Sequence, residues 1–208
     1  MGTLLQILGN HELEFNSGKE AVKVFEERLN TKVVDGTYQS EKVKNKIDNL
    51  SEIEYFVAYD HLENNFNKLN EIKIMTNYKY CPEISLFKRV IRFDNGCKYP
   101  YWKNLILEEV IPKECLDQHE FCKVCWERIK SFSHELMKTF GGYKLVFFGD
   151  SRFQIEEDLY RQGKTLEVLI DEMSKKWLPT NFDEITLRKE EFNVKNGWYI
   201  QQLKGNTE

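Results

Sequence analysis

The 208-residue sequence has no long hydrophobic run and no excess of basic residues. No stretch approaches the roughly 20 apolar residues that a membrane-spanning helix needs. Residues Met1 to Leu8 lack the basic segment of a secretory signal. The net charge of −4 argues against general nucleic-acid binding, because that requires a basic surface to neutralise phosphates. The composition therefore predicts a soluble protein that binds neither membranes nor nucleic acids in general.

Proline and cysteine are also scarce. The chain has only four prolines and no Pro-, Gly- or Ser-rich linker, so we expect a single domain over residues 1–208. Five cysteines, an odd number, favour free thiols in a reducing compartment and hence a cytoplasmic protein. Neither a Walker-type loop nor a Gly-x-Gly-x-x-Gly motif occurs, so we expect no cofactor of the nucleotide type, and no other cofactor is indicated.

The apolar pattern predicts a mixture of strands and helices. A capping box of Ser17 and Glu20 begins a first helix. Other elements are expected as strands at 4–8, 71–78, 84–93 and 143–148, helices at 112–140 and 165–177, and a hairpin within 185–203 that turns at Asn196–Gly197. Because strands and helices do not alternate strictly, the expected class is α+β. We expect a mixed, mostly antiparallel sheet packed on a long central helix (about 113–140), with a C-terminal β-hairpin.

The long helix carries a cluster of soft metal ligands at its start. Cys115, His119, Cys122 and Cys125 fall within eleven residues, and three of them share one helical face. The same face continues through Trp126, Ile129, Ser133, Leu136 and Phe140, which indicates packing in the core. Zinc sites usually take a Cys-x2-Cys pair from a tight turn and a second pair from far away. We therefore expect no metal, with zinc at this cluster as the alternative.

Residues Gly9–Asn10–His11–Glu12 resemble the Gly-Asn-His-Glu block of metallophosphoesterases. The resemblance implies that the Asn and His hold a two-metal centre. In that family an Asp-x-His and a Gly-Asp-x-x-Asp block come first, and the eight residues before Gly9 have no room for them. The sequence therefore favours a polar turn after the first strand.

Residues 146–151, Val-Phe-Phe-Gly-Asp-Ser, resemble the first block of the SGNH hydrolases. The resemblance implies that Ser151 is a nucleophile at the end of an apolar strand. The family's histidine base lies downstream, whereas no histidine follows His134 here. A strand end with Asp150 or Ser151 capping the next helix is favoured. Asp150, Ser151 and Arg152 stay as the candidates for a hydrolytic site.

Two further groups of residues are candidates for recognition. Tyr99, Tyr101, Trp102 and Lys103 surround a proline, and such residues offer a large contact area to a partner or simply cover an edge of the core. Lys88, Arg89 and Arg92 lie in the predicted strand 84–93. Period-two alternation places Lys88 and Arg92 on one face and Arg89 on the other, and a solvated charged face is the simplest interpretation.

These observations favour a non-enzymatic binding protein that neutralises or regulates a partner protein, as immunity proteins and phage-encoded inhibitors do. The reasons are an acidic balance, an aromatic content of 13% and the lack of a complete catalytic motif. One alternative is a small hydrolase with its site around Asp150, Ser151 and Arg152. Another is a small-molecule or nucleotide-binding sensor that uses its aromatic rings for stacking.

Overall fold

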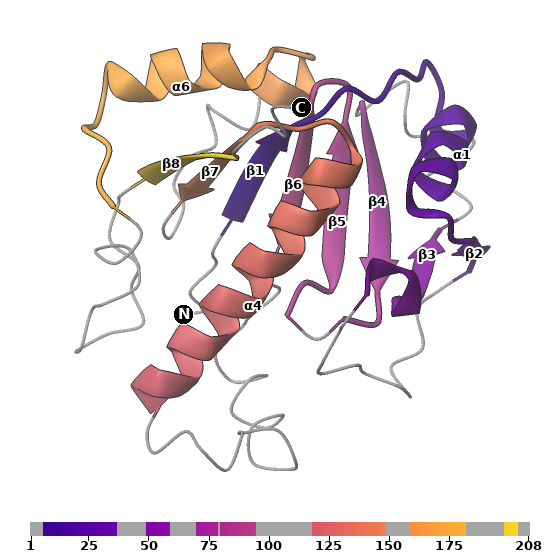
Figure 1. Cartoon of the computed structure of the whole chain (residues 1–208). Coiled ribbons are helices and arrows are strands. Elements are labelled where there is room, and N and C mark those ends of the chain that lie inside the picture. The colour runs from indigo at the N-terminus through magenta and orange to yellow at the C-terminus, as the bar shows by residue number, and fades with distance from the viewer. Residues whose placement is uncertain are drawn as a thin grey trace, which may run out of the picture.

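The computed structural model describes residues 6–36, 49–58, 70–78, 80–94, 118–148, 159–181 and 198–203. Within these residues the chain forms eight strands and four helices, so the predicted α+β class is confirmed (Figure 1). In chain order they are β1 (Gln6–Asn10), α1 (Gly18–Leu29), β2 (Val33–Asp35), the 3-10 helix η1 (Leu50–Glu52), β3 (Tyr55–Val57), β4 (Glu71–Thr76), β5 (Glu83–Phe87), β6 (Val90–Asp94), α4 (Gln118–Thr139), β7 (Lys144–Phe148), α6 (Leu166–Ser174) and β8 (Trp198–Gln202).

The strands form one mixed sheet in the order β2-β3-β4-β5-β6-β1-β7-β8. The pair β2–β3 is parallel and the other described pairs are antiparallel. The first strand therefore lies inside the sheet, between β6 and β7. Helix α1 then carries the chain to the β2 edge, five positions away.

Helix α1 begins where the capping residues predict. The Oγ of Ser17 accepts a hydrogen bond from the backbone N–H of Glu20 at 3.2 Å, and a Glu20 carboxylate oxygen accepts one from the Asn16 N–H at 2.7 Å. These bonds satisfy N–H groups that have no partner within the helix. Asn30 ends the helix in the left-handed conformation, with φ 49°.

Helix α4 lies against the sheet along the face that its spacing predicts. Ile129, Ser133, Leu136 and Phe140 are buried. Glu127 lies on the opposite, exposed side. The predicted start of this helix near residue 113 lies outside the described residues. Within them, α4 begins at Gln118. None of the described helices is long and apolar enough to cross a membrane.

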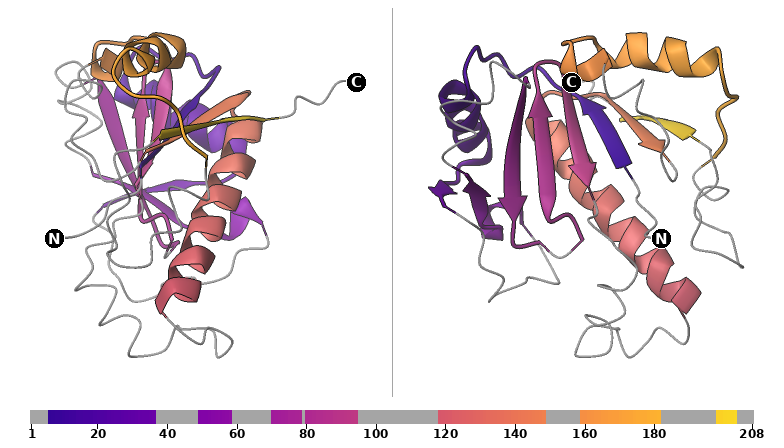
Figure 2. Two further views of the ribbon diagram at one scale, coloured as in Figure 1. Left: turned by 90° about the vertical axis from the view of Figure 1, so that its left-hand side faces the viewer. Right: turned by 180° about the vertical axis from the view of Figure 1, so that it is seen from behind.

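The sheet has an apolar core on each of its faces. Helices α1 and α4 cover one face, where Phe25 and Phe140 pack against strand residues such as Ile7 and Phe147. Helix α6 covers part of the other face, in a second cluster that contains Leu8, Val146, Leu169 and Trp198. Consecutive residues of a strand point to opposite faces, so Ile7 and Leu8 enter different clusters. Figure 2 (left) shows α4 and α6 on opposite sides of the sheet.

The prediction of a single strand over 84–93 is wrong. Strand β5 ends at Phe87 and β6 begins at Val90, and the two pair as an antiparallel hairpin with Leu86 opposite Ile91. Lys88 and Arg89 are exposed in the turn between them. Two charged residues form the turn without Gly, Pro or Asn, so the sequence carries none of the usual turn signals there. Arg92 is consequently not on a solvated face with Lys88 but is buried in the sheet.

The C-terminal strand β8 has one neighbouring strand among the described residues. Strand β8 pairs antiparallel with β7, with Ile200 opposite Val146. The predicted hairpin partner at 185–194 lies outside the described residues. The described part therefore places the C-terminal strand beside β7 and leaves the hairpin as a prediction.

Candidate functional site: a charged cluster on the sheet

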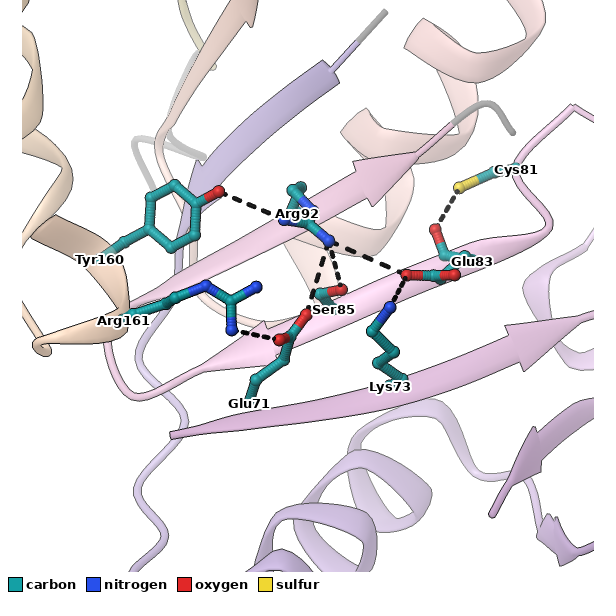
Figure 3. Close-up of polar contacts among 8 residues, drawn as sticks. All are labelled: Glu71, Lys73, Cys81, Glu83, Ser85, Arg92, Tyr160 and Arg161. Carbon is teal, nitrogen blue, oxygen red and sulfur yellow. Dashed lines mark hydrogen bonds and ion pairs between the residues drawn. The ribbon is translucent and has the colours of Figure 1, made fainter. Parts of the chain in front are cut away.

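A cluster of charged side chains lies on the face of β4, β5 and β6 that points away from α4 (Figure 3). The alternate residues of these strands, among them Ile72, Ile84 and Phe93, belong to the core beneath α1 and α4. The register places Lys73 opposite Ser85, and Ser85 opposite Arg92. Directly opposite residues share a face, so the three strands bring these side chains together.

Arg92 is the centre of the cluster. Its side chain is 7% exposed. Its Nη1 donates to the hydroxyl of Tyr160 at 3.2 Å, and its Nη2 donates to the hydroxyl of Ser85 at 3.2 Å. The same Nη2 lies 3.5 Å from Glu71 Oε1 and 3.8 Å from Glu83 Oε1. A buried guanidinium requires such acceptors, because removing an ion from water costs several kcal/mol unless it is paired.

Glu71 joins this centre to a second arginine. Its carboxylate is 2% exposed, and its Oε2 accepts a hydrogen bond from Arg161 Nη1 at 2.7 Å. The ring of Phe87 packs beside both guanidinium groups, whose carbons lie 5.7 Å (Arg92) and 5.6 Å (Arg161) from its centroid. The ring of Tyr160 meets Phe87 edge-on at 4.6 Å. One carboxylate and one aromatic ring thus hold both arginines.

The outer members of the cluster are more exposed than its centre. Lys73 Nζ lies 3.0 Å from Glu83 Oε1, with side-chain exposures of 38% and 24%. Arg161 is 27% exposed. The cluster therefore has a buried centre of Glu71, Ser85 and Arg92 and a partly exposed rim of Lys73, Glu83 and Arg161. We call these six residues, together with Tyr160, the charged sheet face.

The ion pairs of this arrangement hold the charged groups in defined positions. Each carboxylate faces a guanidinium or ammonium group, so its negative charge is already compensated. Lys73 and Arg92 are fixed on strands β4 and β6, and Arg161 is held by Glu71, which limits the entropy lost when these donors bind an acceptor. The charged sheet face can therefore orient a polar or charged group of a ligand without rearrangement of the backbone.

Residues Gly9–Glu12 have a structural role: Gly9 and Asn10 end β1, and His11 and Glu12 follow the strand. The N–H of Leu13 donates to His11 Nδ1 at 3.1 Å, so the proton of the ring is on Nε2, which donates to the carbonyl of Phe87 at 2.8 Å. Asn10 Oδ1 accepts hydrogen bonds from the N–H groups of Tyr143 at 3.1 Å and Lys144 at 2.9 Å. The end of β1 is thereby hydrogen-bonded to the end of β5 and the start of β7.

Acid should destabilise the protein through His11. Burial lowers the pKa of this imidazole from 6.5 to about 4. The unfolded chain therefore takes up the proton first, so the stability that is present above pH 6.5 is lost as the pH falls toward 4. The full interval corresponds to roughly 3 kcal/mol of the free energy of unfolding, of which about 2 kcal/mol is lost by pH 5.

Urea unfolding of wild type and His11→Gln at pH 7 and pH 5 measures this loss of stability. We expect the loss between the two pH values to be smaller in the variant by about 2 kcal/mol, whereas equal losses would contradict the assignment.

The sequence-predicted site residues fall largely beyond the described part. Asp150, Ser151 and Arg152 lie outside it, as do Tyr99, Tyr101, Trp102 and Lys103. Of the soft-ligand cluster, His119, Cys122 and Cys125 lie on α4, with side chains that are not described, and Cys115 lies outside the described residues. In the described ranges no group of three or more His, Cys, Asp and Glu side chains could hold a metal ion.

Arg92 is the one member of the charged sheet face that is a candidate on sequence grounds. A signal is nevertheless present. Strands β4, β5 and β6 read EIKIMT, EISLF and VIRFD, and each contains two polar residues separated by one apolar residue: E-I-K, E-I-S and R-F-D. Opposite charges at alternate positions of neighbouring strands predict cross-strand pairs. The contribution of Tyr160 and Arg161 has no such signal, because it depends on a contact across 90 residues of sequence between Arg161 and Glu71.

In the comparisons with known proteins, no family model, no curated protein and no solved structure matches this chain.

Proposed function

We propose that the protein is a non-enzymatic binding protein that neutralises or regulates a partner protein, and that the partner contacts the charged sheet face. The observation that carries this proposal is a charged cluster fixed within the strands of an otherwise apolar sheet. Apolar side chains of similar volume often stabilise a protein as well as a buried ion pair does, or better. Recognition explains why charges are kept there, because complementary charges determine which partner binds and in which orientation.

An apolar row beside the charged cluster supports the proposal. The register places Val34 opposite Phe56, Phe56 opposite Met75, and Met75 opposite Glu83. Val34 is 50% exposed, and Phe56 and Met75 are half-buried. Protein interfaces combine an apolar centre with a polar rim. The row and the cluster together offer both on one face of the sheet.

The position of the helices also favours this face. In Figure 2 (right) β4, β5 and β6 lie in front of α4, and none of the described helices crosses the middle of β4 and β5 on this side. The rim residues Lys73 and Glu83 come from these two strands. A partner can therefore approach them directly over the surface of β4 and β5.

Retention of a partner from an extract of the source cells tests the proposal. We expect immobilised wild-type protein to retain one protein in stoichiometric amount, which is then purified for calorimetry. Met75→Glu places a charge in the apolar row and should weaken binding by about tenfold or more, equivalent to about 1.4 kcal/mol. Lys23→Glu, on the exposed surface of α1, is the control and should bind as wild type does. The proposal fails if no stoichiometric partner is retained, or if Met75→Glu binds with unchanged affinity while its circular dichroism matches that of wild type.

A further inference from the structure

The partly exposed rim of the charged sheet face is mainly cationic. Among the side chains that the structure describes in this cluster, Lys73, Arg92 and Arg161 supply three formal positive charges, and Glu71 and Glu83 supply two negative ones. The register also places Asp94 opposite Glu83 on the same face. The whole chain has a net charge of −4. Lys73 and Arg161 can attract a negatively charged group although the whole protein is acidic, because salt screens the repulsion from the more distant acidic residues.

The charged groups of the cluster differ in their exposure to solvent. The Glu71 carboxylate is 2% exposed, whereas the Lys73 and Arg161 side chains are 38% and 27% exposed. Figure 3 shows Arg161 and Lys73 on the two sides of Glu71. The Glu71 carboxylate therefore pairs with Arg161 from the buried side of the cluster, whereas Lys73 pairs with Glu83, which is 24% exposed. Both cations keep part of their side-chain surface exposed to solvent.

The two cations are also held in place. Arg161 Nη1 is bound to Glu71 at 2.7 Å, and Lys73 Nζ lies 3.0 Å from Glu83. Asn70 Nδ2 donates to the Arg161 carbonyl at 3.0 Å, which ties the backbone of the arginine to the start of β4. Long side chains normally lose rotamer freedom when they bind, and prior fixation reduces this loss.

We propose that Lys73 and Arg161 bind an acidic side chain of the partner protein, next to an apolar partner residue that packs on Met75. The inference rests on the proposed function and specifies the chemistry of the same face. Charge-assisted hydrogen bonds from a guanidinium or ammonium to a carboxylate are about twice as strong as neutral ones. Met75 follows Lys73 on the same face of β4, so an extended segment with alternating acidic and apolar residues matches this spacing.

Nuclear magnetic resonance of the full chain tests the inference with three probes: the blocked peptide Glu-Leu-Glu-Leu, its counterpart Gln-Leu-Gln-Leu, and inorganic phosphate. The acidic peptide should shift the amide signals of Lys73 and Met75. The Gln peptide and phosphate should each need at least about tenfold higher concentration, corresponding to the loss of about 1.4 kcal/mol. Lys73→Glu should abolish the shifts, and Lys23→Glu should keep them. The inference is overturned if the acidic peptide leaves this face unchanged, if the Gln peptide binds equally well, or if phosphate does, since the site would then take free anions.

The retained partner separates this inference from the proposed function. We expect the double variant Lys73→Glu/Arg161→Glu to lose at least tenfold in affinity for the purified partner, with a wild-type circular dichroism spectrum as the check on folding. If the double variant binds the partner as wild type does, the acidic contact is disproved although partner binding itself stands. If wild type retains no partner, the proposed function fails first.

Discussion

Replacing Glu71 by Ala should lower the free energy of unfolding by about 3–5 kcal/mol, the usual cost of breaking a buried ion pair from one side. Glu71 is 2% exposed and accepts hydrogen bonds from both Arg92 and Arg161. Without it Arg92 stays buried with a weaker set of acceptors. Because Arg161 is 27% exposed, water compensates part of its loss, and we expect the lower end of the range. Urea unfolding followed by circular dichroism measures the change.

Two matched variants define what that result means. Glu27→Ala removes an exposed pair with Lys23, whose charged atoms lie 3.7 Å apart, and should cost less than about 0.5 kcal/mol. The double replacement Glu71→Leu with Arg92→Met removes both buried charges and should recover much of the stability. If Glu71→Ala is no more destabilising than Glu27→Ala, the carboxylate does not compensate buried arginines.

Replacing Phe25 by Ala should also cost about 3–5 kcal/mol, from the lost transfer energy and the cavity that remains. The Phe25 ring is completely buried, 5.2 Å from the ring of Tyr55 in β3 and 5.2 Å from that of Phe140 at the end of α4. It thus joins α1, α4 and the sheet in one cluster. Thermal and urea unfolding would report the effect.

The control for Phe25 is an exposed apolar residue of the sheet. Val34→Ala in β2 should change stability by less than about 0.5 kcal/mol, because its side chain is 50% exposed. Phe25→Leu keeps most of the volume and should cost less than about 1.5 kcal/mol. Equal stabilities of Phe25→Ala and Val34→Ala would place the core elsewhere.

The local elements were predictable because short-range rules determine them. Ser17 and Glu20 identify the start of α1, and the four- and three-residue spacing through Leu136 identifies the buried face of α4. The hairpin of β5 and β6 was missed because Lys88 and Arg89 form its turn without a Gly, Pro or Asn. The order of the strands, with β1 inside the sheet, depends on contacts between distant segments that no local pattern specifies.

The candidate site was harder to predict than the fold. The motif at Gly9–Glu12 drew attention because of its residue types, yet His11 uses both ring nitrogens to hold the backbone. Arg92 was read as a solvated charge because its partners are 7, 21 and 68 residues away in the chain. A short motif describes its neighbours in sequence, whereas the charged sheet face is assembled by cross-strand register.

The central claim is that a partner protein covers the charged sheet face, and the acetylation rate of Lys73 in the purified complex tests it most directly. The Lys73 side chain is 38% exposed in the free protein, so a covering partner should slow its acetylation at least severalfold. Lys23 on α1 and Lys138 on α4, which are 74% and 56% exposed, serve as internal controls on the other side of the sheet. Mass spectrometry of the free protein and of the complex compares the three rates. We predict protection of Lys73 with Lys23 and Lys138 unchanged, whereas an unchanged rate at Lys73, or protection of Lys23 or Lys138 instead, would contradict the account.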